Sequence, residues 1–427
     1  MTADAHERLA DTVRIEGARI LATLVRTVGN LQVAEDAVQE AVIVALRDWP
    51  HRGVPDDPRA WLAVAARHKA IDILRRESAR AGKEREAVDL VELYSPDLPP
   101  DSVVRDDQLR LIFTCCHPAL AAETRVALAL RTLCGLALPQ LAAVLLTSEA
   151  AMAKRLTRAR QKIATARIPY RVPSGAELPA RLAAVCGVIH ALYTAGHAPL
   201  SGPVAYDVDV CAEAVRLGRL LHELMPDEAM PAAVLALLLL TEARRSARLD
   251  AAGELVPLLS QDRSRWDRGL VAEGLALLDA SLRRTGGIAD PYQLQAAIAA
   301  EHARAPSYAA TDWAEIVRLY DLLMSVAPSP AAALSRAVAV AEASGALAGL
   351  AALEEIPASA RWHAVRGELL AREGRFVEAV AEVSASLSGE VTGPERRYRE
   401  RLLARWACQS SGSMGPAGGS WRPAPGR

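Results

Sequence analysis

The segment between Lys154 and Arg171 carries many cations and no acidic residue. Its cations are Lys154, Arg155, Arg158, Arg160, Lys162, Arg167 and Arg171. If the segment begins as a helix, Arg155, Arg158 and Lys162 lie near one face of it. Cations on one side of a rigid element are suited to binding phosphates. The cations alone, however, are more typical of a solvated helix face.

A short helix and a tight turn precede these cations. Leu138–Leu146 predicts the first helix, Thr147 and Ser148 the turn, and Glu149–Arg160 the second helix. Ser148 is a suitable N-cap, and an acidic residue is favourable in the first turn of a helix. In a helix-turn-helix, the second helix presents its N-terminal residues to base edges in the major groove. This context shifts the interpretation of the cations towards DNA.

A second group of polar residues lies in Ala34–Ala41, where acids and a glutamine recur at i,i+4 spacing. On a helix they form one polar stripe opposite Val38 and Val42. The stripe consists of Glu35, Asp36, Gln39 and Glu40. Acids alone are typical of an exposed helix face. General acid–base catalysis and metal binding are not supported, because no histidine or second carboxylate pair recurs at ligand spacing.

A third group, Arg59–Arg76, combines cations with Trp61. On a helix, Leu62, Ala66 and Ile73 can pack inward and leave most of the cations exposed. An aromatic ring beside cations is what capture of single-stranded DNA requires. Trp61 could therefore stack on an unpaired base, or it could simply anchor the core.

The elements that must position these groups are helical. The composition is poor in aromatic residues, at 4%, and rich in helix formers. β-Branched runs at period two are scarce, so the fold class expected is all-α. Helices are predicted at Val13–Val28, Leu31–Trp49 and Pro58–Arg80, with a Pro/Asp/Gly break over Pro50–Pro58.

The formal net charge of −1 excludes a polyelectrolyte such as a histone, but not a local basic stripe. The start of the chain lacks the apolar region of a signal peptide, and the longest apolar run is too short to span a bilayer. A cytoplasmic protein without a membrane contact is therefore expected. The cysteines form no disulfide framework or CxxC pattern, so most are expected to be buried and reduced.

Beyond Leu178, helix follows helix, interrupted by Gly and Pro. Gly367, Gly374 and Phe376 have nearly the spacing of a tetratricopeptide repeat, with a small residue where helices touch and Gly at the turn. A TPR-like array is therefore predicted. The polar segment Gln261–Asp267 has two open interpretations, a concave ligand or peptide site and a polar network between helices. The residues concerned are Asp262, Arg263, Arg265, Trp266 and Asp267.

Taken in order, the three groups resemble an extracytoplasmic-function sigma factor of bacterial RNA polymerase. Leu130, Arg131, Gly135 and Leu136, with Arg155–Arg160, fit sigma region 4 closely. The resemblance covers about the first 170 residues. The remaining chain resembles the subgroup with a C-terminal TPR-like extension, through which such proteins are thought to be controlled.

The resemblance implies the following division of the chain. Residues 7–85 are sigma region 2, 86–104 a linker, 105–170 the region 4 helix-turn-helix, 178–407 the TPR-like domain, and 408–427 a disordered tail. It also implies three sets of site residues. The acidic stripe defined above would bind core polymerase. The minus-10 element would be read by Arg59, Trp61, Arg67, His68, Lys69, Asp72, Arg75 and Arg76. The minus-35 element would be read by Ser148, Glu149, Ala150, Ala153, Lys154, Arg155, Arg158 and Arg160.

Many relatives carry Asn where this chain has His68, so base readout at that position is open. The expected partners are core RNA polymerase, through its β′ clamp helices and β flap, promoter DNA, and a regulatory protein or ligand at the C-terminal domain. No cofactor, metal or catalytic residue is expected. The alternative is a stand-alone helix-turn-helix regulator whose helical domain senses a ligand or protein. In a second alternative the helical array carries the main function of the protein, either as an interaction scaffold or as a helical enzyme.

Overall fold

The computed structural model describes residues 2–81, 101–136, 138–145, 147–166, 168–199, 202, 204–286, 289–389 and 391–410. The predicted tail, from residue 411 on, and most of the predicted linker lie outside these residues. Within them the secondary structure is helical, and the β structure is limited to isolated bridges. The all-α prediction is confirmed. The chain forms two compact units, Met1–Gly196 with Asp209–Pro231, and His197–Val208 with Ala232–Arg427.

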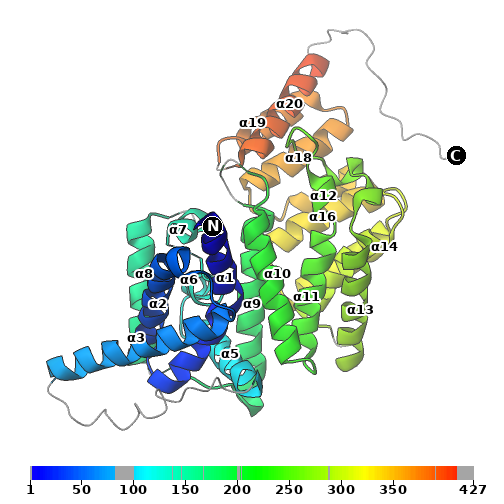
Figure 1. The fold of residues 1–427 in the computed structure, drawn as a ribbon. Helices are drawn as coiled ribbons and strands as arrows, with labels where there is room; N and C mark the ends of the chain where they lie inside the picture. The colour runs from blue at the N-terminus through cyan, green and yellow to red at the C-terminus, as the bar shows by residue number, and fades with distance from the viewer. Residues whose placement is uncertain are drawn as a thin grey trace. The chain divides into compact units, whose positions relative to one another are not determined.

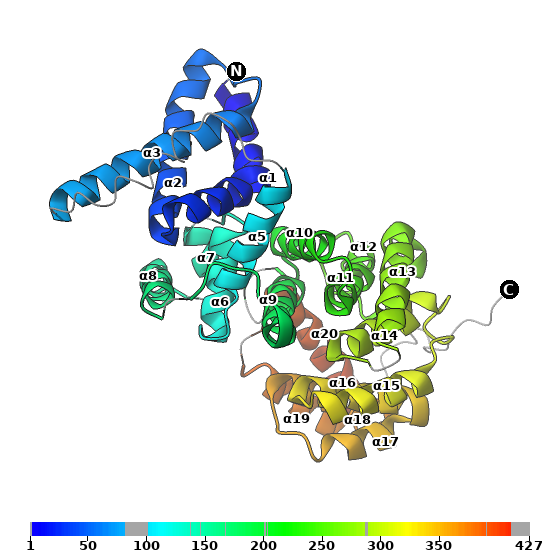
Figure 2. The same cartoon turned by 90° about the horizontal axis from the view of Figure 1, so that it is seen from below.

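The first unit begins with three helices packed against one another, α1 (Thr2–Val28), α2 (Leu31–Arg52) and α3 (Pro58–Ala81) (Figure 2). Gly29 adopts a positive φ of 71° after α1, and the Asn30 side chain accepts from the amides of Gln32 and Val33 to cap α2. This positive φ favours glycine, because it has no Cβ. Helix α1 starts earlier than the sequence predicts.

Helix α2 continues past Pro50, where the sequence predicts a break. Pro50 lies near the last turn of α2, where a proline removes only one amide from the end of the helix's hydrogen-bond pattern. Gly53 ends the helix with a φ of 86°, and its amide donates to the Trp49 carbonyl. The loop that follows leads directly into α3.

Four more helices follow in the same unit, α5 (Asp101–Cys115), α6 (Ala122–Thr132), α7 (Leu138–Val144) and α8 (Glu149–Thr165). Ser148 accepts a hydrogen bond from the Ala151 amide and caps α8, as predicted. Met152 and Leu156 are buried, so α8 turns its apolar face inward. The helix, turn and helix at α7 and α8 agree with the sequence interpretation.

Helices α9 (Leu178–His197) and α10 (Val208–Leu224) contribute to this first unit. The Arg181 guanidinium is buried and donates to the Phe113 carbonyl, and Arg216 donates to the Leu133 carbonyl. The compact units therefore differ from the sequence-based division, which begins the C-terminal domain at Leu178. The stretch Gly175–His197 has the length and apolar composition to cross a membrane, but Arg181 packs it on α5 like a core helix.

The second unit is a succession of helices that pack mainly on their neighbours along the chain (Figure 1). They are α11 (Ala229–Glu242), whose first residues belong to the first unit, α12 (Arg245–Arg248), α13 (Arg268–Arg284), α14 (Pro291–Arg304), α15 (Trp313–Val326), α16 (Pro330–Ser344), α17 (Ala346–Leu353), α18 (Ala360–Arg372), α19 (Phe376–Ser386) and α20 (Gly393–Ser410). Separate small apolar clusters lie between successive helices.

The hairpin of α18 and α19 shows how small residues set this packing. A Cβ on Gly367 would lie 2.6 Å from Val383 Cγ2 and 3.1 Å from the Ala379 carbonyl oxygen. Gly374 turns the chain with a φ of 74°, and Phe376 opens α19. The sequence placed a close approach, a turn and a helix start at these residues, and the structure agrees.

Helix α20 contacts two segments from the start of the second unit. Glu254 forms ion pairs with Arg397 and Arg401, and the Gly393 amide donates to the Gly202 carbonyl at 2.9 Å. A cavity of about 500 Å³ lies inside this closure, lined from the 198–205 segment to α20. Two of its arginines have internal partners, since Arg248 donates to the His197 carbonyl and Arg399 to the Ser386 carbonyl.

Two residues of the polar segment Gln261–Asp267 form an inter-helix network, Arg263 and Trp266, whereas Asp262, Arg265 and Asp267 are exposed. Arg263 is buried and donates to the carbonyls of His302 and Ala305 and to the Thr311 hydroxyl. The Trp266 ring is also buried, with the Arg263 guanidinium over its face. These contacts tie the segment to α14 and the loop that follows.

Five of the six cysteines are buried, as the sequence predicts, and Cys408 is exposed. Burial raises the pKa of Cys116 and of Cys134 to about 12. These thiols therefore serve as small apolar groups. The part of the chain that the structure describes holds no group of three or more His, Cys, Asp or Glu suited to a metal ion.

The second unit should lose stability on mild acidification. Burial, with Arg248 and Arg244 nearby, lowers the pKa of His197 to about 2, and burial with Arg244 and Arg263 lowers that of His302 to about 3. Below their ordinary pKa of 6.5 the unfolded chain binds protons that the folded chain does not. The free energy of unfolding should be unaffected above that pH and fall below it by up to about 1.4 kcal/mol per pH unit for each histidine.

Urea unfolding of the full chain between pH 7.5 and 5.5 measures this loss. His302→Gln should reduce the pH dependence, whereas His68→Gln, at an exposed position on α3, serves as the control and should leave it unchanged. Equal stability at both ends of the pH range would contradict the prediction.

Candidate nucleic-acid and helix-docking surfaces

The cations of α8 border a groove of about 460 Å³ in the first unit. Its other side is formed by Leu120 and Ala121, which precede α6, and by Thr124 in the first turn of α6. The groove is lined on α8 by Ala151, Lys154, Arg155, Arg158, Ala159 and Lys162. No acid is among the lining residues, so the groove concentrates positive potential and can receive phosphate oxygens.

The start of α8 presents small residues to solvent. Glu149, Ala150 and Ala151 are exposed, and Ala153 is half-buried one turn further on. A helix N-terminus with short side chains can approach a base edge or a phosphate closely. Seven of the eight residues predicted for the minus-35 element therefore lie on one accessible end and side of α8.

Arg160 is the exception among the predicted α8 residues. Its side chain is 19% exposed, and its Nε donates to a carboxylate oxygen of Glu35 on α2 at 2.5 Å. The cation therefore faces away from the groove and into a contact between α8 and α2.

Cations of α3 form ion pairs with acids of the neighbouring helices. Arg59 lies 3.5 Å from Glu16 on α1, and Lys69 and Arg76 each lie 3.6 Å from Glu40 on α2. These pairs are partly exposed, and such pairs stabilise a fold by about 1 kcal/mol or less. An incoming phosphate can therefore exchange with these acids at small cost.

The other residues predicted for the minus-10 element differ in exposure. His68, Asp72 and Arg75 are exposed along α3. Arg67 is half-buried, and burial lowers the pKa of its guanidinium. Of the predicted residues, Arg59 and Trp61 lie near the start of α3 and the others lie from Arg67 on, with the exposed apolar Val64 between the two groups.

Trp61 forms one wall of a second hollow, at the loop between α2 and α3. Its ring packs edge-on against Trp49 with centroids 5.6 Å apart. The hollow, of about 310 Å³, is lined by Asp48, Trp49, Arg52, Gly53, Val54, Pro55, Asp56 and Trp61. Trp61 is half-buried and packs against the buried Trp49, so it anchors the loop and is also partly accessible to solvent.

The sequence interpretation missed this loop hollow. It treated Pro50–Pro58 only as a break between helices. The available signal was a tryptophan on each side of a Gly/Pro turn, which brings two aromatic rings together when the helices form a hairpin. Trp61 is the partly accessible aromatic side chain of this hollow, because Trp49 is only 2% exposed.

The predicted acidic stripe on α2 divides in two. Asp36 and Gln39 are exposed, and Glu40 is half-buried beside the α3 cations. Glu35, by contrast, is 5% exposed and accepts from Thr132 Oγ1 at 2.7 Å as well as from Arg160. In this structure three of the four residues line an accessible helix face, and Glu35 lies beneath it.

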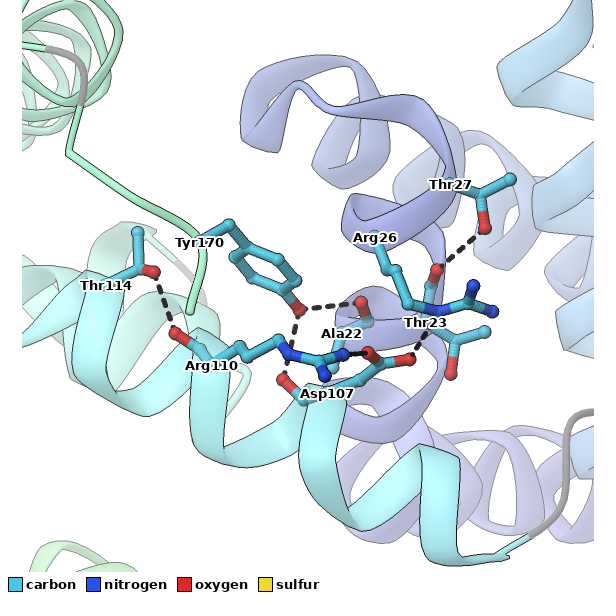
Figure 3. A network of polar contacts seen from close by, with 8 residues as sticks. All are labelled: Ala22, Thr23, Arg26, Thr27, Asp107, Arg110, Thr114 and Tyr170. Atoms are coloured by element: carbon cyan, nitrogen blue, oxygen red, sulfur yellow. Dashed lines mark hydrogen bonds and ion pairs between the residues drawn. The ribbon is translucent and has the colours of Figure 1, made fainter. Parts of the chain in front are cut away.

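A second polar contact joins α1 to α5 (Figure 3). Asp107 is fully buried and pairs with Arg26 at 3.0 Å and with Arg110 at 2.6 Å. The Tyr170 hydroxyl lies 2.7 Å from the Ala22 carbonyl oxygen and 3.0 Å from that of Asp107, so its proton bridges the two helices. Burial raises the pKa of the Asp107 carboxyl, and both arginines oppose this effect.

Comparisons with known proteins fall on these elements. Residues 13–80 match a family model of sigma-70 region 2, and residues 110–163 match one of sigma-70 region 4. Residues 181–282 match a family of unknown function, DUF6596, which begins on α9. No solved structure matches the chain.

Two relatives differ in how much of the chain they share. A Rhizobium meliloti (strain 1021) protein named "Uncharacterized protein R00370" is 42% identical over 398 residues, 91% of this chain and 93% of that protein. The "Probable ECF RNA polymerase sigma factor SigI" of Mycobacterium tuberculosis (strain CDC 1551 / Oshkosh) is 32% identical over 174 residues, 39% of this chain and 58% of that protein.

Arg158→Ala should weaken binding of the full chain to duplex DNA and make it less dependent on salt. Each phosphate contact that is lost reduces the slope of log K against log salt by about 0.9. Thr157→Ala, at an exposed neutral position one residue away, is the matched control. Titration of a labelled duplex at several salt concentrations measures both quantities, and equal slopes for the two variants would contradict a phosphate role for Arg158.

Proposed function

We propose that this chain, which belongs to the same family as the Rhizobium meliloti protein and carries sigma-70 regions 2 and 4, is an extracytoplasmic-function-type sigma factor. It binds core RNA polymerase, directs it to promoters and helps to open the DNA. The observation that carries the proposal is the order of the surfaces. An acidic helix face and an aromatic-cationic strip lie within residues 13–80, and a cation-lined helix-turn-helix lies within residues 110–163.

The proposed polymerase contact is the acidic face of α2. Asp36 and Gln39 are exposed on one side of a rigid helix, which suits docking against the β′ clamp helices. Region 4 would contact the β flap. Complementary charge at such a surface favours fast association and correct orientation.

The proposed promoter contacts use two kinds of chemistry. At the minus-10 element, the half-buried Trp61, supported by Trp49, and the cations of α3 offer stacking and phosphate contacts to a melted strand. At the minus-35 element, the exposed start of α8 and its groove offer base-edge and phosphate contacts to a duplex. The binding free energy of these contacts supplies the free energy of promoter opening, so no catalytic group is needed.

Regulation through the C-terminal helices is part of the proposal. Arg181 and Arg216 join α9 and α10 to the helices around region 4, so a partner that moves α9 or α10 can act on region 4 directly. The helix hairpins of α13 to α20 support a TPR-like array that binds a regulatory protein or ligand.

Run-off transcription with purified core polymerase and the full chain, on a pool of genomic promoter fragments, tests the function. Transcripts that require the chain are expected. A stand-alone regulator would instead bind promoters tightly without polymerase and yield no transcript. Absence of any transcript from all templates would refute the proposal.

Asp36→Lys should weaken binding to core polymerase by at least about tenfold, because it reverses a charge at the centre of the exposed face. The chain should remain folded, since the Asp36 side chain is exposed. Glu7→Lys, at an exposed position on α1, makes the same charge change away from α2 and is the control. Fluorescence titration of labelled chain with core polymerase measures both affinities. Equal affinities would show that α2 is not the polymerase contact.

A further inference from the structure

We propose that Glu35, Thr132 and Arg160 form a closing contact that holds region 2 against region 4 and competes with core polymerase for the α2 face. The inference rests on the proposed function and adds a mode of control to it. Glu35 is expected to bind core polymerase and Arg160 is expected to bind promoter DNA, but in the structure these two residues bind each other.

The geometry of the closing contact is that of a buried, fully used carboxylate. One Glu35 oxygen accepts from Thr132 Oγ1 at 2.7 Å, and the other accepts from Arg160 Nε at 2.5 Å. Only 5% of Glu35 is exposed, so an external helix cannot reach it. The charged neighbour Arg131 donates to the Leu136 carbonyl, and burial lowers its pKa while Glu35 opposes that effect.

The two sides come from helices far apart in the sequence. Glu35 lies in the region 2 match, Arg160 in the region 4 match and Thr132 at the end of α6. Releasing Glu35 to a polymerase helix therefore requires α6 and α8 to move away from α2. In the closed form Asp36 and Gln39 remain exposed, so polymerase can first touch the face and then displace region 4.

A charged contact suits such a device better than an apolar one would. A buried ion pair gains little net free energy, since desolvation of the two charges offsets their attraction. Opening the closing contact costs free energy only while Glu35 and Arg160 each lack a new partner of opposite charge. A cationic polymerase surface for Glu35 and DNA phosphates for Arg160 provide these partners, so binding and opening are coupled.

Variants that weaken the closing contact without touching the exposed face test the proposal. Thr132→Val removes one donor and keeps the side-chain shape, and Arg160→Met removes the charge and keeps most of the length. Gln161→Met is the control, because Gln161 is exposed next to Arg160 on the same helix and belongs to none of the proposed contact sets. Binding is measured with core polymerase in the absence of DNA, so loss of a DNA contact cannot contribute.

If the closed form holds about 90% of the molecules, opening it raises the apparent affinity by about tenfold. Arg160→Met is therefore expected to bind core polymerase about tenfold more tightly than the native chain, and Thr132→Val by a smaller factor, while Gln161→Met binds as the native chain does. Equal or weaker binding by both Thr132→Val and Arg160→Met would overturn the proposal.

A distance measurement separates this inference from the proposed function. Spin labels at Arg47→Cys on α2 and Thr157→Cys on α8, in a Cys408→Ser background, report the separation of the two regions. A short distance that lengthens in Arg160→Met, and in the native chain on adding core polymerase, supports the contact. An unchanged distance in both cases refutes it. If the chain binds no polymerase, the proposed function fails, and the distance in Arg160→Met still decides whether Arg160 holds the regions together.

Discussion

Buried carboxylates set the main constraint on the first unit. An ionised carboxylate away from water is strongly unfavourable unless cations and hydrogen-bond donors surround it. Asp107 and Glu35 meet this requirement only when distant parts of the chain come together, since Arg26 lies 81 residues before Asp107 and Arg160 lies 125 residues after Glu35. Removing one partner of such a pair costs about 3–5 kcal/mol, because the other charge is left buried. Regions 2 and 4 are therefore held in one specific register rather than by apolar contact alone.

The same chemistry that joins the regions serves the partners proposed for them. An acid that contacts polymerase and an arginine that contacts DNA are also the most suitable ligands for each other. The structure divides these groups, leaving Asp36 and the α8 groove open while Glu35 and Arg160 are paired. In the proposed function, this division keeps first encounters possible while the full contact surface stays incomplete.

Local features of the fold could be predicted from the sequence, and the environment of single residues could not. Caps and turns are local, so Ser148, Gly374 and the helix starts at Pro58 and Phe376 are where the sequence places them. The i,i+4 pattern of the acidic stripe describes one helix and says nothing of what packs on it. It could not show that Glu35 is buried by α6 and α8 while Asp36 beside it is exposed.

Two larger features escaped prediction for the same reason. The Trp49–Trp61 pair depends on the angle between two helices, and the placement of α9 and α10 depends on contacts to Phe113 and Leu133 across the fold. The Pro and Gly residues near position 175 suggested a domain boundary, because such residues commonly mark linkers. Pro and Gly residues can end a helix, but they do not determine which helix the next one packs against.

The position of α9 and α10 bears on how a signal could reach the promoter-binding parts. The DUF6596 match covers residues 181–282, so one sequence family spans helices of the first unit and helices of the second. Arg181 anchors its first part to the Phe113 carbonyl on α5, and Arg216 anchors it to the Leu133 carbonyl, directly after the last residue of α6, Thr132. A displacement of α9 or α10 would thus be felt at Thr132 and, through it, at Glu35. The contact of α10 with Leu133 and the closing contact therefore meet at the end of α6.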